Sequence, residues 1–276
     1  MAKQFLTAQT VREALSLHDG SSAFLAGGTE INRLNSTVEA DTLISIRQID
    51  ALKKVEEQDG FINIGALCTF QQAIEEELVP DWFKEACRFM ASRTRRNMAT
   101  IGGNIAAGRD DSYIIPTLAA AGARLTLAGK DGEKECSVFD YLGGSSCGAE
   151  KEAAPCESDL ITVISLPKDA GFVKSVRHSN TAQSHAYLTV AFAAKDLDHI
   201  EMAAGVKNGG IYHLTDLAAA MMEDHDVADQ TLVDMVTGCE GAEFPTDMFG
   251  SEKYKRYLLG ITAAGLLADA KKGGLS

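Results

Sequence analysis

Two glycine pairs, Gly27–Gly28 and Gly102–Gly103, are the residues whose type and spacing most clearly suggest binding chemistry. Glycine adopts positive φ angles and lets a ligand approach the backbone, and consecutive backbone N–H groups can form a concave nest for phosphate oxygens. Each pair is predicted to form a turn, and the small polar residues Thr29 and Asn104 follow. Two such turns from separate segments could hold one pyrophosphate between them.

The glycine pairs fit none of the common nucleotide motifs. Neither matches the dinucleotide fingerprint G-x-G-x-x-G, and the P-loop pattern G-x-x-x-x-G-K-[ST] does not occur in the chain. The residues by themselves therefore indicate a phosphate-bearing ligand that is held by the backbone, and they do not support a Rossmann or P-loop fold.

Side chains suited to acid–base chemistry are sparse. His178 and His185 are the only close histidine pair, and they are expected to make local hydrogen bonds rather than to bind a metal. Asp110 and Asp111 could form a catalytic pair, although adjacent acids usually mark a solvated loop. We therefore expect no catalytic residue in this chain and a reaction carried by a cofactor, which the protein binds and tunes.

The composition is that of an ordinary globular protein of 276 residues, with 45% hydrophobic and 24% charged residues. A net charge of −13 argues against nucleic acid or an anionic membrane as the partner, since both are polyanions. The sequence has no apolar run of the roughly 18 residues that span a bilayer. The first residues lack the apolar core of a signal peptide, so a cytoplasmic location is expected.

Six cysteines are scattered through the sequence without a Cys-x-x-Cys pair: Cys68, Cys87, Cys136, Cys147, Cys156 and Cys239. In a cytosolic chain, reduced and mostly structural thiols are expected. Cys136, Cys147 and Cys156 share one predicted loop region and could in principle hold a metal or cluster. Three ligands are one short of the usual four of an iron–sulfur cluster, so we expect no metal site.

The first third of the chain is predicted to open as a β-α-β unit. A capping-box pattern over Thr10–Glu13 begins a helix between two short strands, and the strand over Asp41–Ile46 is expected to pair in parallel. Asp59-Gly60 predicts a hairpin turn. A second capping box, Thr69–Gln72, begins a helix that stops at Pro80, and a further helix is predicted over Asp81–Arg93.

The rest of the chain mixes both element types. A helix ending at Gly122 precedes a strand over Arg124–Leu127, four more strands are predicted between Leu160 and Val206, and a long helix closes the chain. This order predicts an α+β protein of two or three subdomains. Seams near Glu57 and Lys168–Gly171 give the boundaries 1–57, 58–168 and 169–276.

Longer motifs resemble a known family. "FLAGGTEI" is similar to the first FAD loop, and "SRTRRNMATIGGNIAAGRDDSYIIPTLAAAGARLTL" to the second FAD loop, of the FAD-binding medium subunit of the molybdenum hydroxylases, the xanthine dehydrogenase and carbon monoxide dehydrogenase type. "SDLITVISLP" and "SEKYKRYLLG" resemble the family's closing strand and last helix. The resemblance covers essentially the whole chain.

The resemblance implies an FAD-binding fold similar to that of p-cresol methylhydroxylase (PCMH) and vanillyl-alcohol oxidase. Residues 1–57 and 58–168 would be FAD-binding subdomains 1 and 2, and residues 169–276 a smaller C-terminal α+β flavoprotein domain. Carried over residue by residue, the family's cofactor contacts fall on Leu25, Ala26, Gly27, Gly28, Thr29, Glu30 and Ile31, then on Thr100, Gly102, Gly103 and Asn104, and finally on Ile161 and Lys174.

One position departs from the family pattern. Many relatives place an aspartate, which bonds the ribityl hydroxyls of FAD, where this chain has Tyr113. Tyrosine is bulkier and uncharged, and it donates and accepts hydrogen bonds. Asp110, Asp111 or Ser112 could replace the missing carboxylate, so Asp111 and Tyr113 are both candidate cofactor contacts.

The resemblance implies an FAD-carrying electron-transfer subunit of a molybdenum hydroxylase or dehydrogenase. Its partners would be a large subunit with the molybdenum cofactor and a small subunit with [2Fe–2S] clusters, and NAD or another acceptor would take the electrons. Two alternatives are a stand-alone FAD-dependent oxidoreductase and a scaffold subunit with a weakened FAD site. The sequence names neither the substrate, nor the electron acceptor, nor the oligomeric state.

Overall fold

The computed structural model describes residues 2–34, 36, 38–143, 145–146, 159–239 and 241–275. The chain forms two compact units, each of which is described by itself. Unit 1 comprises Met1–Gly108, Arg124–Ser137 and Pro155–Leu166, and unit 2 comprises Arg109–Ala123, Val138–Ala154 and Pro167–Ser276. Helices and strands occur in both units, which confirms the α+β prediction. The boundaries at residues 57 and 168 stay predictions.

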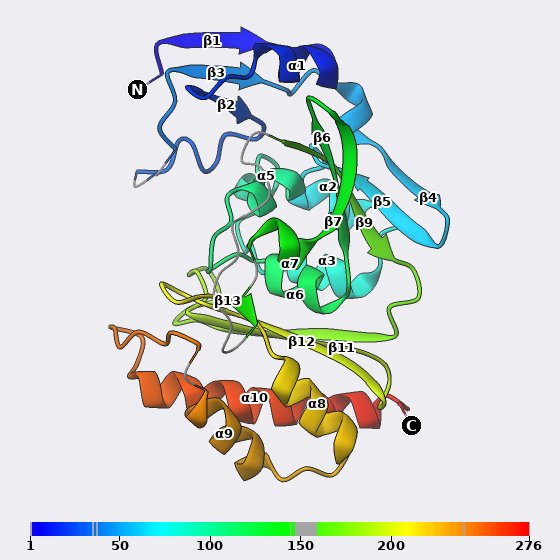
Figure 1. Ribbon diagram of the computed structural model, residues 1–276, viewed down its shortest axis with the longest axis vertical. Coiled ribbons are helices and arrows are strands. Elements are labelled where there is room, and N and C mark those ends of the chain that lie inside the picture. The colour runs from blue at the N-terminus through cyan, green and yellow to red at the C-terminus, as the bar shows by residue number, and fades with distance from the viewer. Residues whose placement is uncertain are drawn as a thin grey trace. The chain divides into compact units, whose positions relative to one another are not determined.

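The chain begins with a parallel three-stranded sheet in unit 1. Strands β1 (Gln4–Thr7) and β2 (Ser22–Leu25) both pair in parallel with the central β3 (Thr42–Ser45), as the β-α-β prediction requires. Helix α1 (Val11–Leu17) connects β1 to β2, and its buried Ala14 shares a small core with Ile44 of β3. The sheet and its helix lie at the upper end of unit 1 in Figure 1.

A second sheet of unit 1 has the order β4-β5-β9-β6-β7. The strands are β4 (Val55–Gln58), β5 (Phe61–Gly65), β9 (Leu160–Pro167), β6 (Arg124–Gly129) and β7 (Gly132–Ser137). Asp59 and Gly60 have φ angles of 50° and 82° and form the predicted hairpin turn between β4 and β5. The 3₁₀ helix η1 (Asp50–Lys53) precedes this hairpin.

Four short helices complete unit 1: α2 (Phe70–Glu75), α3 (Asp81–Arg88), α4 (Arg93–Arg96) and α5 (Ile101–Ala106). The capping box at Thr69 and Gln72 is present as predicted. The helix predicted to run to Arg93 ends five residues earlier, because Ser92 starts a new helix by accepting a hydrogen bond from the N–H of Arg95. Ser92 is thus the N-cap of a separate helix, which the amphipathic pattern did not predict.

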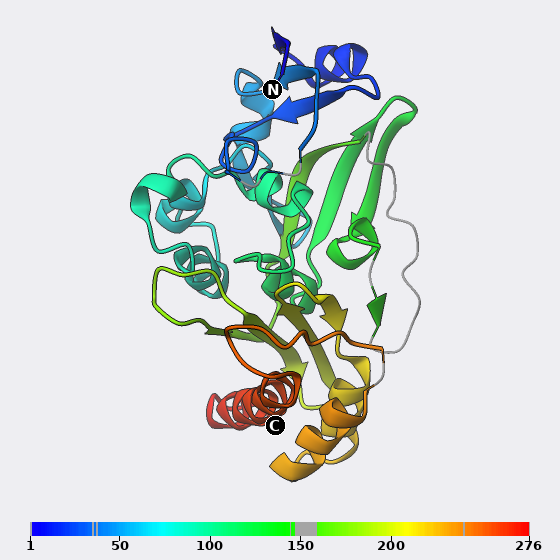
Figure 2. The same cartoon turned by 90° about the vertical axis from the view of Figure 1, so that its left-hand side faces the viewer.

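Unit 2 is built on a sheet with the order β10-β11-β12-β13-β8. Its strands are β10 (Phe172–His178), β11 (Leu188–Asp196), β12 (His199–Val206), β13 (Gly210–His213) and β8 (Ser145–Ser146). The first four strands pair antiparallel, and β10, β11 and β12 lie where the apolar segments predicted strands. Helices α6 (Ile115–Ala120) and α7 (Val138–Tyr141) lie on one side, and α8 (Thr215–Glu223), α9 (Asp229–Gly238) and α10 (Glu252–Lys272) on the other (Figures 1 and 2).

The alternation along β11 explains this two-sided cover. Leu188, Val190 and Phe192 pack into the large core beneath α8 to α10, whereas Ala191 and Ala193 pack with Ala120 of α6. Successive side chains of a strand point to opposite faces, so a strand buried on both sides is apolar throughout. The small alanines on one face let α6 lie close to the sheet.

The structure also tests the predictions on cysteines and membrane segments. Cys68, Cys87 and Cys136 are free thiols, and burial raises the pKa of Cys68 to about 12. Cys239 is disulfide-bonded, so the expectation of reduced thiols is wrong at this position. Cys147 and Cys156 lie outside the described residues. Within the described ranges, no three His, Cys, Asp or Glu side chains are grouped for a metal, and no helix is long and apolar enough to cross a bilayer.

Candidate functional site

The first glycine pair directly follows β2. Gly28 has a φ of +74°, and its carbonyl accepts hydrogen bonds from the backbone N–H of Asn32 at 3.1 Å and from the side-chain amide of Asn32 at 2.8 Å. A Cβ on Gly27 would collide with the backbone carbonyl oxygen of Met98, so this glycine is required by close packing. The predicted turn is therefore confirmed here.

The backbone N–H groups of this turn are available to a ligand. Across the described part of the chain, Gly27, Gly28 and Thr29 donate no backbone hydrogen bond. Backbone N–H groups need an acceptor from protein, water or ligand. Three successive N–H groups without a protein acceptor, at a turn with positive φ, are suited to an anionic oxygen.

The second glycine pair is not a turn, and the predicted nest is wrong at this position. Gly102 and Gly103 lie in helix α5, whose N-terminus is capped by the Thr100 hydroxyl accepting from the N–H of Gly103 at 3.1 Å. The N–H of Gly102 donates to the carbonyl of Ala66 at 3.0 Å, and that of Asn104 to the carbonyl of Thr100 at 3.0 Å. These N–H groups already have protein acceptors.

The two glycines of α5 have different roles. A Cβ on Gly102 would lie 2.6 Å from the Cβ of Ala66, so this glycine lets the helix pack on the core. A Cβ on Gly103 would lie 2.6 Å from Oγ1 of Thr100 and 3.8 Å from the Cβ of Ala26, on the side of a cavity. The absence of a side chain at Gly103 thus leaves room in the cavity, whereas Gly102 allows α5 to pack closely against Ala66.

That cavity, of about 180 Å³, brings together most of the predicted site residues of unit 1. It is lined by Ala23, Phe24, Ala26, Gly27, Gly28, Thr29, Glu30, Ile31, Val38, Thr100, Gly103, Ala106 and Ala107. Three candidates nearby do not line the cavity: Leu25 ends β2, Gly102 is buried against Ala66, and Asn104 lies in α5. Ile161 is 4% exposed and lies in β9, paired with Leu127.

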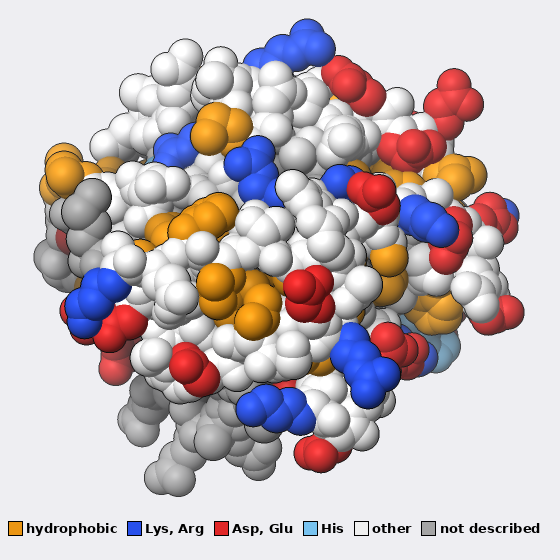
Figure 3. All heavy atoms as spheres, turned by 90° about the horizontal axis from the view of Figure 1, so that it is seen from above, with side chains coloured by type: hydrophobic (Ala, Val, Ile, Leu, Met, Phe, Trp, Pro, Cys, Tyr) orange, Lys and Arg blue, Asp and Glu red, His pale blue; other side chains and the backbone are white. Residues whose placement is uncertain are grey.

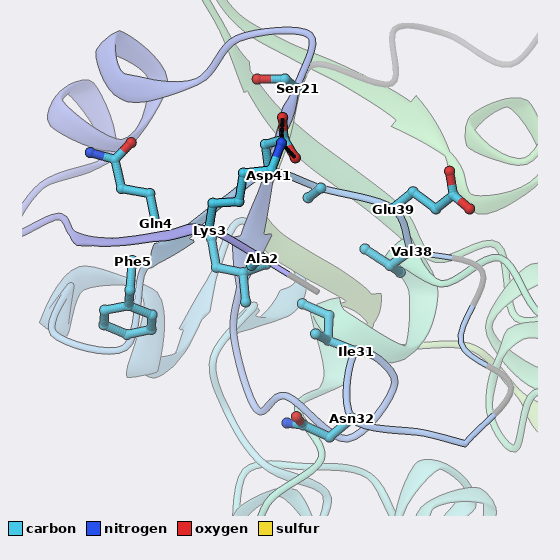
Figure 4. Close-up of a pocket in the computed structure, with 12 residues that line it drawn as sticks. Ala2, Lys3, Gln4, Phe5, Ser21, Ile31, Asn32, Val38, Glu39 and Asp41 are labelled. Carbon is cyan, nitrogen blue, oxygen red and sulfur yellow. Dashed lines mark hydrogen bonds and ion pairs between the residues drawn. The ribbon is translucent and has the colours of Figure 1, made fainter.

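A larger cavity of about 750 Å³ adjoins the first on unit 1 and shares Ile31 and Val38 with it. Figure 4 shows these two side chains above Asn32, with the ion pair between Lys3 and Asp41 at the opposite side. Ile31 is the only candidate site residue among those that line this cavity. Figure 3 looks onto this end of the unit, where apolar, acidic and basic side chains are interspersed.

Two further candidates, Asp111 and Tyr113, lie together in unit 2. The side chain of Asp111 is only 2% exposed, and its carboxylate lies 2.6 Å from the guanidinium of Arg109. Nδ1 of His185 lies 3.4 Å from Asp111, and Nε2 of the same ring lies 3.3 Å from the hydroxyl of Tyr113. The expectation of a solvated loop is thus wrong for Asp111, because its buried carboxylate pairs with Arg109 and lies against the ring of His185.

Asp110 has a different environment from its neighbour. Burial, and then the charge of Asp111, raise the pKa of Asp110, although a backbone hydrogen bond from Asn208 opposes this. The local hydrogen bonds expected for the histidines are instead long-range ones. His178 pairs with Thr262 of α10 at 2.8 Å, and His185 with Tyr113.

Lys174 lies on β10, and its ammonium group is 2.7 Å from the carboxylate of Asp269 in α10. The hydrogen bond from Lys174 and its charge lower the pKa of Asp269. The contact of Lys174 with the cofactor stays a prediction. The contact between His185 and Tyr113 could not be predicted, because the two residues lie 72 positions apart and no motif links their segments.

Comparison with known families adds the decisive observation. The sequence model of the FAD binding domain in molybdopterin dehydrogenase matches residues 1–169. The chain belongs to this family. The match includes both glycine segments and the whole of the smaller cavity.

Individual relatives include one that is named an FAD-subunit. The chain is 30% identical to the uncharacterized protein YgfM of Escherichia coli strain K12, over 99% of this chain and 98% of that protein. It is 26% identical to the nicotinate dehydrogenase FAD-subunit of Eubacterium barkeri, over 60% of this chain and 58% of the relative. Carbon monoxide dehydrogenase from Hydrogenophaga pseudoflava has the same fold, with a TM-score of 0.84 at 20% identity, covering 99% and 98% of the two chains.

The cofactor of this flavoprotein subunit is FAD. The residues of unit 1 fit such a group: the turn over residues 27–29 offers N–H donors that lack protein acceptors, and the cavity wall at Gly103 carries no Cβ. A pyrophosphate requires both donors and close approach to the backbone.

Proposed function

We propose that this chain is the FAD-carrying electron-transfer subunit of a multi-subunit molybdenum hydroxylase or dehydrogenase. Electrons would leave the substrate on a large subunit that holds the molybdenum cofactor and cross the [2Fe–2S] clusters of a small subunit. They would reach FAD on this chain and pass to NAD or another acceptor. The observation that carries the proposal is the family match over a segment that contains the cavity at Gly27–Thr29 and Gly103.

The names of the relatives support a subunit rather than a complete enzyme. One relative is named an FAD-subunit, and others are named medium chains of glyceraldehyde and carbon monoxide dehydrogenases. These names differ in substrate, so the xanthine dehydrogenase-like assignment of the sequence analysis stays a prediction. The cytoplasmic location and the identity of the acceptor do so as well.

Within unit 1, we assign the pyrophosphate of FAD to the smaller cavity. The N–H groups of Gly27, Gly28 and Thr29 would donate to phosphate oxygens, and the hydroxyl of Thr100 would add a polar contact. Asn104, outside the cavity lining, stays a predicted contact. Gly103 would let the phosphates approach α5. Leu25, Ala26, Glu30, Ile31 and Gly102 complete this segment as contacts or as the packing that holds it, and Ile161 stays a proposed apolar neighbour of the flavin.

The mechanism assigned to this chain is binding and orientation. When bound, FAD would supply the electron-accepting chemistry that the side chains of this chain cannot provide. The backbone turn after β2 would hold the anionic part of the cofactor. Asp111 and Tyr113 stay predicted cofactor contacts. Lys174, held by Asp269, is the proposed cationic contact from β10.

The test combines flavin binding with identification of the partner chains. The affinity-tagged chain, isolated gently from its source cells, should co-purify with iron–sulfur and molybdenum subunits and carry the visible absorbance of a flavin. Addition of the substrate of the complex should bleach that flavin band, and NAD should restore it if NAD is the acceptor. A catalytically competent chain that is isolated alone would contradict the subunit role, and a folded chain that stays colourless under saturating FAD would contradict the cofactor site.

A further inference from the structure

Helix α10 of unit 2 has an exposed face that carries no charge. The helix packs on α9, β10 and β11, and Figure 2 shows it close to end-on, with α9 and α8 on one side of it. Between Lys253 and Asp269 the only charged residues are Lys255 and Arg256, and both side chains are buried. Six residues at helical spacing face solvent instead, fully or in part: Tyr254, Tyr257, Leu258, Ile261, Gly265 and Ala268.

This arrangement is the reverse of an ordinary surface helix, which turns its charged residues outward. Nζ of Lys255 lies 2.8 Å from Oδ1 of Asp247, and the guanidinium of Arg256 donates to the carbonyls of Val236 and Ala242 at 2.8 Å each. Both charges are thus used in the interior of unit 2. An uncharged outer face on a helix of 21 residues is typical of a surface that another molecule covers.

Large exposed hydrophobic side chains gather at one end of this face. Among the described residues of unit 2 they are Met248, Tyr254 and Tyr257, with exposed fractions of 85%, 46% and 49%. Met248 lies shortly before α10, and a Cβ on the nearby Gly250 would lie 2.6 Å from Cδ1 of Tyr254. Methionine and tyrosine are enriched where proteins bind one another. This end of the face therefore has the composition of a protein interface.

The opposite end of the face consists of small residues. A Cβ on Gly265 would meet no atom within 4 Å, and Ala268 is exposed one turn later. Tyr257 and Gly265 lie four residues on either side of Ile261, and Tyr254 and Ala268 lie seven residues on either side of it. A twofold axis at Ile261 would therefore place each tyrosine of one α10 opposite a small residue of a second, antiparallel α10.

The charges beside this face are complementary in the same pairing. Lys253 and Lys271 are about five turns apart and so lie on the same side of α10. The carboxylate of Asp226 lies 2.6 Å from Nζ of Lys271 and is 92% exposed. An axis at Ile261 brings Lys253 of one copy level with Asp269 of the other, within one turn of that ion pair. The exposed ammonium of Lys253 would thus meet the exposed carboxylate of Asp226.

We propose that the uncharged face of α10 is the docking surface for a second copy of this chain, which binds antiparallel about a twofold axis at Ile261. The inference goes beyond the proposed function and does not depend on FAD. A strip of about 30 Å by 10 Å is smaller than the roughly 800 Å² per partner of a standard interface. The dimer is therefore expected to be reversible, and its dissociation constant is the quantity to measure.

Sedimentation velocity of the full chain at increasing concentration tests the association. The wild-type chain should pass from monomer to dimer. Gly265→Glu should raise the dissociation constant at least about 10-fold, because its carboxylate would be buried against Tyr257 without a partner. Gly20→Glu is the matched control: its Cβ would also meet no atom within 4 Å, and it adds the same charge to unit 1. The control should leave the dissociation constant unchanged, and circular dichroism checks that both variants fold.

An exchange of charges tests the antiparallel register. Lys253→Glu should raise the dissociation constant about 3- to 10-fold, because the contact with Asp226 occurs twice in a twofold dimer. Lys253→Glu combined with Asp226→Lys should recover most of this loss. A double variant that associates no better than Lys253→Glu alone would overturn the register.

A cysteine on the proposed axis tests the geometry directly. Ile261→Cys should give a disulfide-linked dimer under a mild oxidant, because a residue on a twofold axis faces its own copy. Ala219→Cys, at an exposed position of α8, should not. Cross-linking through position 219 but not through position 261 would overturn the proposal.

Two results would overturn the dimer itself. The first is a wild-type chain that stays monomeric at every concentration. If α10 is then protected from hydrogen exchange only in an assembled complex, the uncharged face binds another subunit and not a second copy. The second is a dimer whose dissociation constant is the same in the wild-type chain and in Gly265→Glu, because such a dimer uses a different surface. Neither result bears on the binding of FAD, which is measured separately.

Discussion

Gly103 and Ala26 face each other across the smaller cavity of unit 1, where a Cβ on Gly103 would lie 3.8 Å from the Cβ of Ala26. One residue belongs to helix α5 and the other to the segment that follows β2. Small residues on both walls keep the space between these two elements open. The width of the cavity therefore depends on side chains that are absent or short.

The first prediction is that Gly103→Leu abolishes retention of FAD while the fold persists. The new side chain would project toward the cavity and occupy space that the proposed pyrophosphate needs. Bound flavin per chain is measured by absorbance after gel filtration, and secondary structure by circular dichroism. Gly265→Leu is the control, since a Cβ at this exposed position of α10 meets no atom within 4 Å. Unchanged flavin retention in Gly103→Leu would remove the assigned cavity.

The second prediction concerns the neighbouring glycine and has a different cause. A Cβ on Gly102 would lie 2.6 Å from the Cβ and 2.9 Å from the carbonyl oxygen of Ala66, in a buried contact. Gly102→Ala should therefore lower the free energy of unfolding by about 1–3 kcal/mol, the usual cost of overpacking. Urea denaturation of the cofactor-free chain measures this. Gly103→Ala should lower the free energy of unfolding less, because Gly103 lines the cavity whereas Gly102 packs against Ala66. A larger loss in Gly103→Ala than in Gly102→Ala would contradict this assignment.

The sequence predicted the elements of unit 1 well where local chemistry decides them. The capping box at Thr69 and the hairpin at Asp59-Gly60 are complete within a few residues, so their hydrogen bonds follow from local spacing. The helical state of Gly102 and Gly103 could not be predicted in this way. Glycine disfavours helix interiors, and here contact with Ala66 and the Thr100 cap override that preference.

The candidate site could be predicted only in part for a similar reason. The turn at Gly28 requires a positive φ, and the glycine pair predicts such a turn because glycine adopts positive φ readily. The buried Asp111 pairs with Arg109, two residues away, and lies 3.4 Å from His185, which the segment between β10 and β11 carries 74 positions further along the chain. Two adjacent acids predict a solvated loop from local sequence alone, because the burial of Asp111 results from segments that are distant in the sequence.

The third prediction is a pH dependence at Asp110. Burial, followed by the charge of Asp111, raises the pKa of Asp110 in the folded chain above its unfolded value. The folded state therefore binds this proton more tightly, and its contribution to stability falls as the pH rises from the ordinary carboxyl range through the raised pKa. Asp110→Asn should accordingly raise the melting temperature at neutral pH, and this gain should disappear in acid.

Asp269 provides a control of opposite sign for Asp110. The hydrogen bond and charge of Lys174 lower the pKa of Asp269, so its contribution is present above the ordinary carboxyl range and is lost as the pH falls through the lowered pKa. Asp269→Asn should therefore lower the melting temperature at neutral pH. Melting curves of both variants across the acid range check the two signs, and a loss of stability in Asp110→Asn at neutral pH would contradict the burial argument.

The last prediction concerns the buried cation of α10. The side chain of Lys255 is fully buried, and its Nζ lies 2.8 Å from Oδ1 of Asp247 and 2.6 Å from the carbonyl oxygen of Pro245. Burial raises the pKa of Asp247, but hydrogen bonds from Lys255 and the N–H of Phe249 outweigh this and lower it overall. The stabilisation is thus present at neutral pH and is lost as the pH falls below the ordinary carboxyl range.

Asp247→Asn should leave the ammonium of Lys255 buried without its counter-charge and lower the free energy of unfolding at neutral pH by roughly 3 kcal/mol. Asp226→Asn removes the partner of Lys271 in an exposed pair and should change the free energy of unfolding far less. Because removal of both charges avoids the unpaired ion, Asp247→Leu combined with Lys255→Met should recover much of the loss. Urea denaturation of the wild-type chain and these three variants measures the losses. If the double variant loses as much stability as Asp247→Asn, Asp247 acts through the loop geometry around Phe249 and not through the charge of Lys255.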